Sequence, residues 1–280
     1  MFERASAVAN LAPLRLIAAA GLFCLAATTS AAAAPPPSVY LEDLTWTEVR
    51  DALRAGTTTI IIPAGGTEQN GPHMVLGKHN VRVKVLAGRI ATSLGDALVA
   101  PVLTYVPEGA ISPPTEHMRF PGTISIPDDV FKATLLAASR SLKQAGFMHI
   151  VLIGDSGNYQ AMLRGVAEQL NRDWRGTPVR AHFVGEYYRI TQTAYVQALR
   201  ARGLSDAQIG THAGVADTSL LMAIDPSLIR TDRLEIAAKD PSSGVGSDPR
   251  ASTAALGQTG LDLIVAGTVA AIREARSGHR

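Results

Sequence analysis

The stretch that decides the fold runs from Thr57 to His73 and reads TTTIIIPAGGTEQNGPH. Its first part, residues 57–63, contains three consecutive isoleucines, a pattern typical of a strand that is buried on both faces. A glycine-rich turn follows at once and carries the carboxylate of Glu68. In parallel sheets, ligands bind beyond the carboxyl ends of the strands. The stretch therefore predicts a central strand and one edge of a functional site.

Outward from this stretch, apolar runs predict further strands, and amphipathic segments between them predict helices. The predicted strands cover residues 97–106, 150–153 and 179–184. The predicted helices cover residues 81–94, 128–145, 158–174, 190–201 and 253–276. Another helix is expected to begin near Thr45, because Thr45 and Glu48 are spaced as a capping box and Gly56 provides a stop. This alternation predicts an α/β fold, a three-layer α/β/α sandwich with a mostly parallel central sheet.

Residues 1–34 have the features of a secretory signal peptide. Arg4 and Arg15 form a basic start, residues 16–28 are apolar, and residues 30–34 offer small side chains for cleavage. The apolar stretch is shorter than the ~20 residues that a membrane span needs, which disfavours an uncleaved anchor. We therefore expect a periplasmic or secreted protein whose mature chain begins between Ala32 and Pro35. It is expected to form no stable membrane insertion after cleavage.

The rest of the chain, residues 35–280, is predicted to form a single domain. Residues 240–252 are rich in Ser, Gly and Pro and predict a loop, but they are too few to link two domains. The one cysteine, Cys24, lies inside the leader, so the mature chain has no thiol nucleophile and no disulfide. A lipid anchor on Cys24 is disfavoured because the residue directly before it, Phe23, is not small. The formal net charge of +2 gives no reason to expect nucleic acid or an anionic membrane as a partner.

Two polar clusters follow predicted strands. The first contains Glu68, His73 and His79, whose oxygen and nitrogen atoms are usual ligands for zinc or manganese. The alternative is that these side chains only bond to nearby turns. The second is GDSGN at residues 154–158, where Asp155 either contributes to a site or caps the next helix. Ser156 is a poor candidate nucleophile because Asn158 stands where the Gly-x-Ser-x-Gly elbow needs glycine.

Other histidines divide into candidate site residues and structural ones. His117 lies in a loop rich in proline and polar groups, which forms either a surface turn or a wall of the site. His212 is either an ordinary residue at a helix start or a general acid or base. His149 and His182 lie in or beside predicted strands and are expected to be structural.

Five segments resemble the creatininase (creatinine amidohydrolase) family, over about residues 44–272. They are PAGGTEQNGPHMVLG at 63–77, EHMRFPGTIS at 116–125, GDSGN at 154–158, HAGVADTS at 212–219 and GVGSDPR at 244–250. The resemblance implies a creatininase-like fold and a binuclear metal hydrolase that acts on cyclic or other small amides. It also implies a ring-like homo-oligomer, a hexamer.

The metal ligands of the family are altered in this sequence. Glu68 matches the family's ligand Glu. Asn70 replaces the first ligand His, and Gly157 stands where some members have Glu. His79 replaces the bridging Asp, while Asp155 replaces the ligand His of the second motif, so these two changes are reciprocal. We therefore expect one site with Glu68, His79 and Asp155 as ligands, with one ion favoured over two, and none as an alternative.

The resemblance also assigns the remaining roles. His212 is expected to protonate the leaving group, with Asp217 standing where a family Glu often follows. The expected contacts to substrate come from Asn70, His73, Glu116, His117, Ser156 and Asn158. Lys78 is expected to point to solvent rather than to the second metal position. The predicted function is metal-dependent hydrolysis of a C–N bond in a small, possibly cyclic amide; the alternative is a catalytically silent protein that binds a small ligand or a partner.

Overall fold

The central sheet has four parallel strands in the order β2-β1-β3-β4. They are β1 (Thr59–Ala64), β2 (Ala97–Val99), β3 (His149–Gly154) and β4 (Arg180–Phe183). The computed structural model describes Met1 and residues 36–278, so the predicted signal peptide lies outside the described residues. The register pairs Thr59 with both Ala97 and His149, which brings the carboxyl ends of β1 and β3 to one edge.

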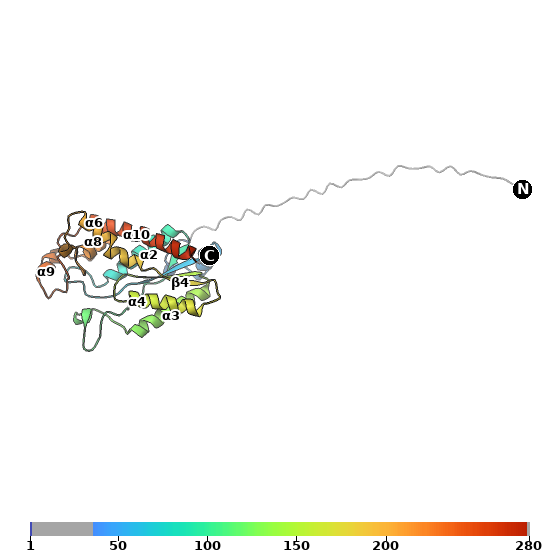
Figure 1. Cartoon of the computed structure of the whole chain (residues 1–280), viewed down its shortest axis with the longest axis horizontal. Coiled ribbons are helices and arrows are strands. Elements are labelled where there is room, and N and C mark those ends of the chain that lie inside the picture. Colours follow the sequence, from blue (N-terminus) through green and yellow to red (C-terminus); the bar gives the residue numbers. More distant parts are fainter. Residues whose placement is uncertain (2–35, 279–280) are drawn as a thin grey trace. The chain divides into compact units, whose positions relative to one another are not determined.

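Helices cover both faces of the sheet (Figure 1). One layer contains α2 (Lys78–Leu94), α5 (Glu186–Gln192), α6 (Ala194–Arg200), α8 (Val215–Ile224) and α10 (Ala254–Ser277). The other contains α1 (Trp46–Arg54), α3 (Asp128–Ala145) and α4 (Gln160–Asp173). Shorter elements are α7 (Asp206–Ile209), α9 (Leu234–Lys239), and the 3-10 helices η1 (Leu41–Asp43), η2 (Glu116–Arg119), η3 (Pro226–Leu228) and η4 (Thr231–Arg233). The predicted α/β sandwich with a parallel sheet is confirmed.

The three isoleucines of β1 explain the two layers. Successive strand residues point to opposite faces, and Ile61 packs into the layer of α2 and α10, whereas Ile60 and Ile62 pack into the layer of α3 and α4. All three side chains are fully buried. Helix α10 has a mean hydropathy of 1.5 and is long enough to cross a bilayer, but it packs against α8, α5 and α2 within this layer.

Three elements differ by three residues or more from the sequence-based predictions. Strand β2 ends at Val99 rather than at residue 106, and contact with β1 resumes only as an isolated bridge at Leu103, whose N–H donates to Pro63 O. The predicted helix 190–201 is two helices, separated at Thr193, whose φ and ψ are −124° and −88°. Helix α2 begins at Lys78, three residues before the predicted start at residue 81. The last difference places three more residues in the first turn of α2, and two of them, Lys78 and His79, lie beside the candidate site.

Candidate active site

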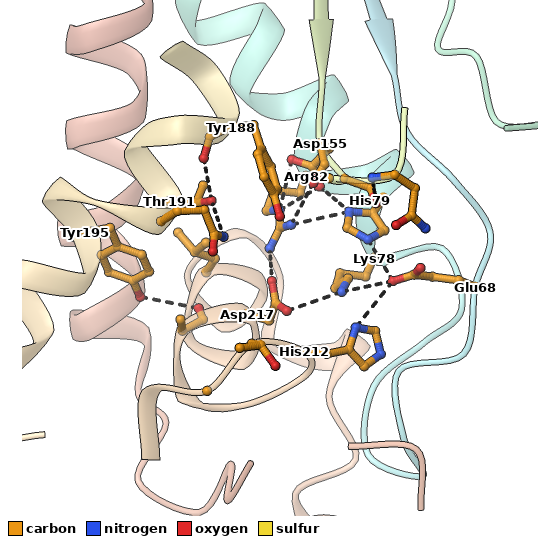
Figure 2. A pocket seen from close by; sticks show the side chains of 18 of the residues that line it. Glu68, Lys78, His79, Arg82, Asp155, Tyr188, Thr191, Tyr195, His212 and Asp217 are labelled. Atoms are coloured by element: carbon orange, nitrogen blue, oxygen red, sulfur yellow. Dashed lines mark hydrogen bonds and ion pairs between the residues drawn. The ribbon is translucent and has the colours of Figure 1, made fainter. Parts of the chain in front are cut away.

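Polar side chains gather where β1 and β3 end and α2 begins. Glu68 follows β1, Asp155 follows β3 directly, and the first turn of α2 presents Lys78 and His79 toward them (Figure 2). Together with Arg82 these residues line a pocket of about 210 Å³. All five side chains are at least nine-tenths buried. The convergence follows from the topology, since neighbouring parallel strands end at the same edge of a sheet.

His79 connects the two strand ends. Its Nε2 lies 2.8 Å from Glu68 Oε1, and its Nδ1 lies 2.6 Å from Asp155 Oδ2. Asp155 is held further by Arg82, whose Nε donates to Oδ2 at 2.8 Å, and by Tyr187, whose hydroxyl donates to Oδ1 at 2.6 Å. The predicted ligands Glu68, His79 and Asp155 are thus brought together as a hydrogen-bonded chain. In this arrangement both ring nitrogens of His79 have carboxylate partners.

Lys78 and Arg82 add two cations to this chain, and Asp217 of α8 faces both. Lys78 Nζ lies 3.3 Å from Glu68 Oε1 and 3.4 Å from Asp217 Oδ2 (Figure 2). Arg82 Nη1 donates to Asp217 Oδ1 at 2.7 Å. The Lys78 side chain is 1% exposed, so the expectation that it points to solvent is wrong. Because a buried ammonium is costly unless it is paired, the two carboxylates determine where Lys78 lies.

The pKa values reflect this pairing. Burial alone would raise the pKa of Glu68, but the charges of His79 and Lys78 outweigh burial and lower it. Burial and Lys78 both lower the pKa of His79, yet Glu68 and Asp155 together raise it above its ordinary value. For Asp217, the charges of Lys78 and Arg82 likewise outweigh burial and hold the pKa well below its usual range. The cluster therefore favours the charged form of each of these three groups.

His212 faces the same carboxylate from the loop before α8. Its Nε2 lies 3.1 Å from the backbone oxygen of Gln69, which can only accept, so Nε2 carries the ring hydrogen. The Gln69 amide nitrogen is also 3.2 Å from this Nε2, but its two hydrogens have acceptors in Gly244 O and His117 Nδ1. The lone pair is then on Nδ1, 3.8 Å from Glu68 Oε1. Burial, and then the charge of Lys78, lower the pKa of His212 to about 4, which keeps the ring neutral at neutral pH. His212 consequently presents a lone pair to the pocket.

Asp217 positions this loop as well as the cations. Its Oδ2 accepts a hydrogen bond from the backbone N–H of Ala213 at 3.0 Å. Ala213 has a φ of 53°, a left-handed conformation that residues other than glycine seldom adopt. Such outliers are maintained when the surroundings over-determine them, and they cluster at functional sites. In this structure the carboxylate of Asp217 thus fixes the backbone next to His212.

The six predicted substrate contacts divide into two groups. His117, Ser156 and Asn158 line the pocket. Asn70, His73 and Glu116 are not among its lining residues: Asn70 donates to the backbone oxygens of Glu68 and Val75, His73 bonds Thr218 Oγ1 at 3.0 Å, and Glu116 is exposed on η2. Asn70 and His73 are fully buried, so they support the turn that carries Glu68.

The two capping alternatives are also resolved. Helix α4 begins at Gln160 after Tyr159, and no side chain caps it, so Asp155 is not its cap. The carboxylate of Glu68 bonds His79 rather than a turn, and the Asn70 amide bonds the backbone oxygen of Glu68, not its carboxylate. His149 and His182 lie in β3 and β4 with ring centroids 5.3 Å apart, as expected for structural residues.

Sequence reasoning missed Glu108 and Arg82. Glu108 follows Pro107 beyond the end of β2, is fully buried, and accepts from Asn158 Nδ2 at 3.1 Å. Burial, and then the nearby charge of Glu68, raise its pKa to about 8, so this carboxyl retains its proton at neutral pH. For Arg82 a signal was available: it stands one helical turn after Lys78 and three residues after His79, which places all three on one face.

A metal ion is implied by the resemblance, and the described residues contain one group that fits it. Ligand atoms of Glu68, His117 and His212 all lie within 4.8 Å of one another, a set of nitrogen and oxygen donors that suits zinc. Glu68 and His212 offer lone pairs. The Gln69 amide donates to Gly244 O at 2.9 Å and to His117 Nδ1 at 3.1 Å, which leaves the hydrogen of His117 on Nε2, 3.3 Å from Glu68 Oε2. Binding by all three residues therefore requires His117 to rearrange its proton.

Comparison with known proteins places the sequence features in a family. The pattern of the family described as "Creatinine amidohydrolase" matches residues 42–272. The chain is 28% identical to the creatinine amidohydrolase of Pseudomonas putida, over 85% of this chain and 97% of that protein. It is 30% identical to the mycofactocin precursor peptide peptidase of Mycobacterium ulcerans, over 67% of each.

Solved structures agree with the sequence matches. A structure titled "Creatininase Mn" superimposes with a TM-score of 0.71 at 25% identity, over 85% of this chain and 98% of that chain. A mutant creatininase of the "Zn-Zn type" superimposes with a TM-score of 0.69 at 26% identity, over 85% of this chain and 98% of that one. These relatives are thus named as amide hydrolases, and these two titles name manganese or zinc.

Proposed function

The chain belongs to the creatininase family, and from this premise we propose that it hydrolyses a C–N bond of a small, possibly cyclic amide with the help of one divalent metal ion. The names of its relatives and the titles of their structures support the general assignment of this chain as a metal-dependent amide hydrolase. The observation that carries the proposal is the convergence of Glu68, His117 and His212 on the pocket.

Different residues of the pocket would have different roles in such a reaction. Glu68, His117 and His212 would hold the ion, which when bound supplies Lewis acidity for water and for an amide carbonyl. Gln69 orients both histidines through their other ring nitrogens, an arrangement that commonly supports metal ligands. Asp217 fixes the loop of His212 through the N–H of Ala213. Lys78 pairs with Glu68 and Asp217, and Arg82 pairs with Asp155 and Asp217, so these two cations balance the carboxylates of the pocket.

The first prediction concerns metal removal. The purified protein is expected to contain about one zinc or manganese ion per chain and to hydrolyse one or more members of a panel of cyclic and linear amides. Dialysis against a chelator should abolish hydrolysis, because the ion supplies the Lewis acid. Return of Zn²⁺ or Mn²⁺ should restore it. Elemental analysis measures metal content, and chromatographic loss of the amide measures hydrolysis of cyclic and linear substrates on the same sample.

The alternative function, a silent protein that binds a ligand, is favoured by one observation: the carboxylates of Glu68, Asp155 and Asp217 are already paired with Lys78, His79 and Arg82. A protein that stays metal-free and inert after zinc and manganese are added would support this alternative. It would overturn the proposed hydrolase.

We also propose that the protein is exported and that it assembles as a homo-oligomer. The basic start, apolar run and small residues within 1–34 support export. Expression with the full leader is expected to yield a mature chain that begins between Ala32 and Pro35. N-terminal sequencing of the periplasmic or secreted form measures this start; Met1 on that form would contradict export by cleavage.

A further inference from the structure

The first turn of α2 contains positively charged side chains, which are usually disfavoured at the N-terminus of a helix. Lys78 and His79 lie there, Arg82 follows one turn later, and no acidic residue is present in the first turn. The N-terminus of a helix has a partial positive charge, so cations at this end are unfavourable unless other groups compensate. In this fold the compensation comes from carboxylates that follow β1 and β3 and from Asp217 of α8.

The Lys78 ammonium lies between two carboxylates, as a bound metal ion would. Its nitrogen lies between Glu68 Oε1 at 3.3 Å and Asp217 Oδ2 at 3.4 Å, and Lys78 also lines the pocket. Two carboxylate oxygens that face each other across a buried space are donors that a divalent cation prefers. Here the protein's own ammonium occupies that space.

The Lys78 ammonium pairs with two carboxylates, which leaves one of its N–H groups to donate to a ligand. An ammonium has three hydrogens and no acceptor, and the partners of Nζ among the described residues are the two carboxylates. The pocket is the remaining direction in which Nζ meets a ligand. A carbonyl oxygen that becomes negative during attack is stabilised by such a preorganised donor in a site that excludes water.

We propose that the Lys78 ammonium takes the place of a second metal ion, so that this pocket binds one divalent ion at most and uses Lys78 to bind the carbonyl oxygen of the substrate amide. The inference rests on the proposed function for the identity of the substrate, but its statement about cation positions does not. Arg82 contributes a second fixed charge behind Lys78, because both bond Asp217. Two divalent ions would therefore add four positive charges beside two cations that are already buried.

The test counts ions in variants of the full chain. Isothermal titration calorimetry with Zn²⁺ or Mn²⁺ measures the number of ions bound per chain. It is carried out on the wild type and on Lys78→Ala, Lys78→Arg and Lys84→Ala. Lys78→Ala is expected to bind one ion more than the wild type, since removal of the ammonium exposes Glu68 and Asp217 to a cation. Lys78→Arg retains the charge and should bind no extra ion. Lys84→Ala is the matched control, because Lys84 lies on the same helix but pairs with Glu42 at the surface.

A second variant, Lys78→Met, keeps the bulk of the side chain and removes its charge. It is expected to bind the same number of ions as the wild type and to lower kcat for the amide identified by the panel by about 100-fold. An unchanged ion count in Lys78→Ala would overturn the proposal, and so would a wild-type kcat in Lys78→Met. The ion count of the wild type itself tests the proposed function, whereas the difference between variant and wild type tests Lys78, so the two can fail separately.

Discussion

Replacement of Glu68 by alanine is expected to abolish binding of a divalent metal and to reduce amide hydrolysis by at least about 100-fold. Glu68 is the carboxylate of the candidate metal group, and its two oxygens face His117, His212, His79 and Lys78. Its loss removes the anionic ligand and leaves buried cations without their partner. Metal content and kcat, measured on folded protein, report the two effects.

Two further variants separate the role of Glu68 as a ligand from its role in packing. Glu68→Gln keeps the shape but removes the charge, and it is expected to lose metal nearly as completely as alanine does. Glu168→Ala on α4 is the control, because Glu168 is exposed and lies outside the site. Full metal content in both Glu68 variants would mean that the metal is held elsewhere.

Replacement of Arg82 by methionine is expected to cost about 3–5 kcal/mol of the free energy of unfolding. The side chain is 3% exposed and bonds Asp155 through Nε and Asp217 through Nη1. Without it, Asp155 and Asp217 lose a cation, and breaking a buried pair by removing one partner is strongly destabilising. Chemical denaturation at neutral pH measures the change.

The matched control is Arg89→Met on the same helix. Arg89 is exposed, so its replacement is expected to change stability by no more than about 0.5 kcal/mol. If Arg82→Met and Arg89→Met were equally stable, the ion network would contribute no more than surface charges do. That outcome would also weaken the case that Asp155 and Asp217 are fixed in place by Arg82.

The paired charges give one physical account of how this chain can differ from the ligand set that the resemblance implies. His79 bonds the carboxylates of Glu68 and Asp155 at 2.8 and 2.6 Å, and Lys78 lies between the same Glu68 oxygen and Asp217 Oδ2. Cations supplied by side chains can thus satisfy carboxylates that metal ions would otherwise neutralise. Replacement of Glu68 and replacement of Arg82 test this account from both sides, since one removes an anion and the other removes a cation.

The sequence alone determined the layers of the fold and the edge at which the site lies. The run Ile60–Ile62 requires burial on both faces, and the helical periodicities on either side of it provide the two covers. Glycine-rich and polar residues directly after strands then indicate where β1 and β3 end. These signals are local, so they can be read without knowing which segments meet.

Only the tertiary structure decided which of the polar residues face one another. His79 and Asp155 are 76 positions apart, and Lys78 and Asp217 are 139 apart, so their pairing depends on sheet order and on how α8 packs. The predicted ligand set and the predicted solvent exposure of Lys78 both came from residue positions along a motif, which carry no information about burial. Burial changes the outcome, because a lysine that is free in water must find carboxylates once the fold removes it from solvent.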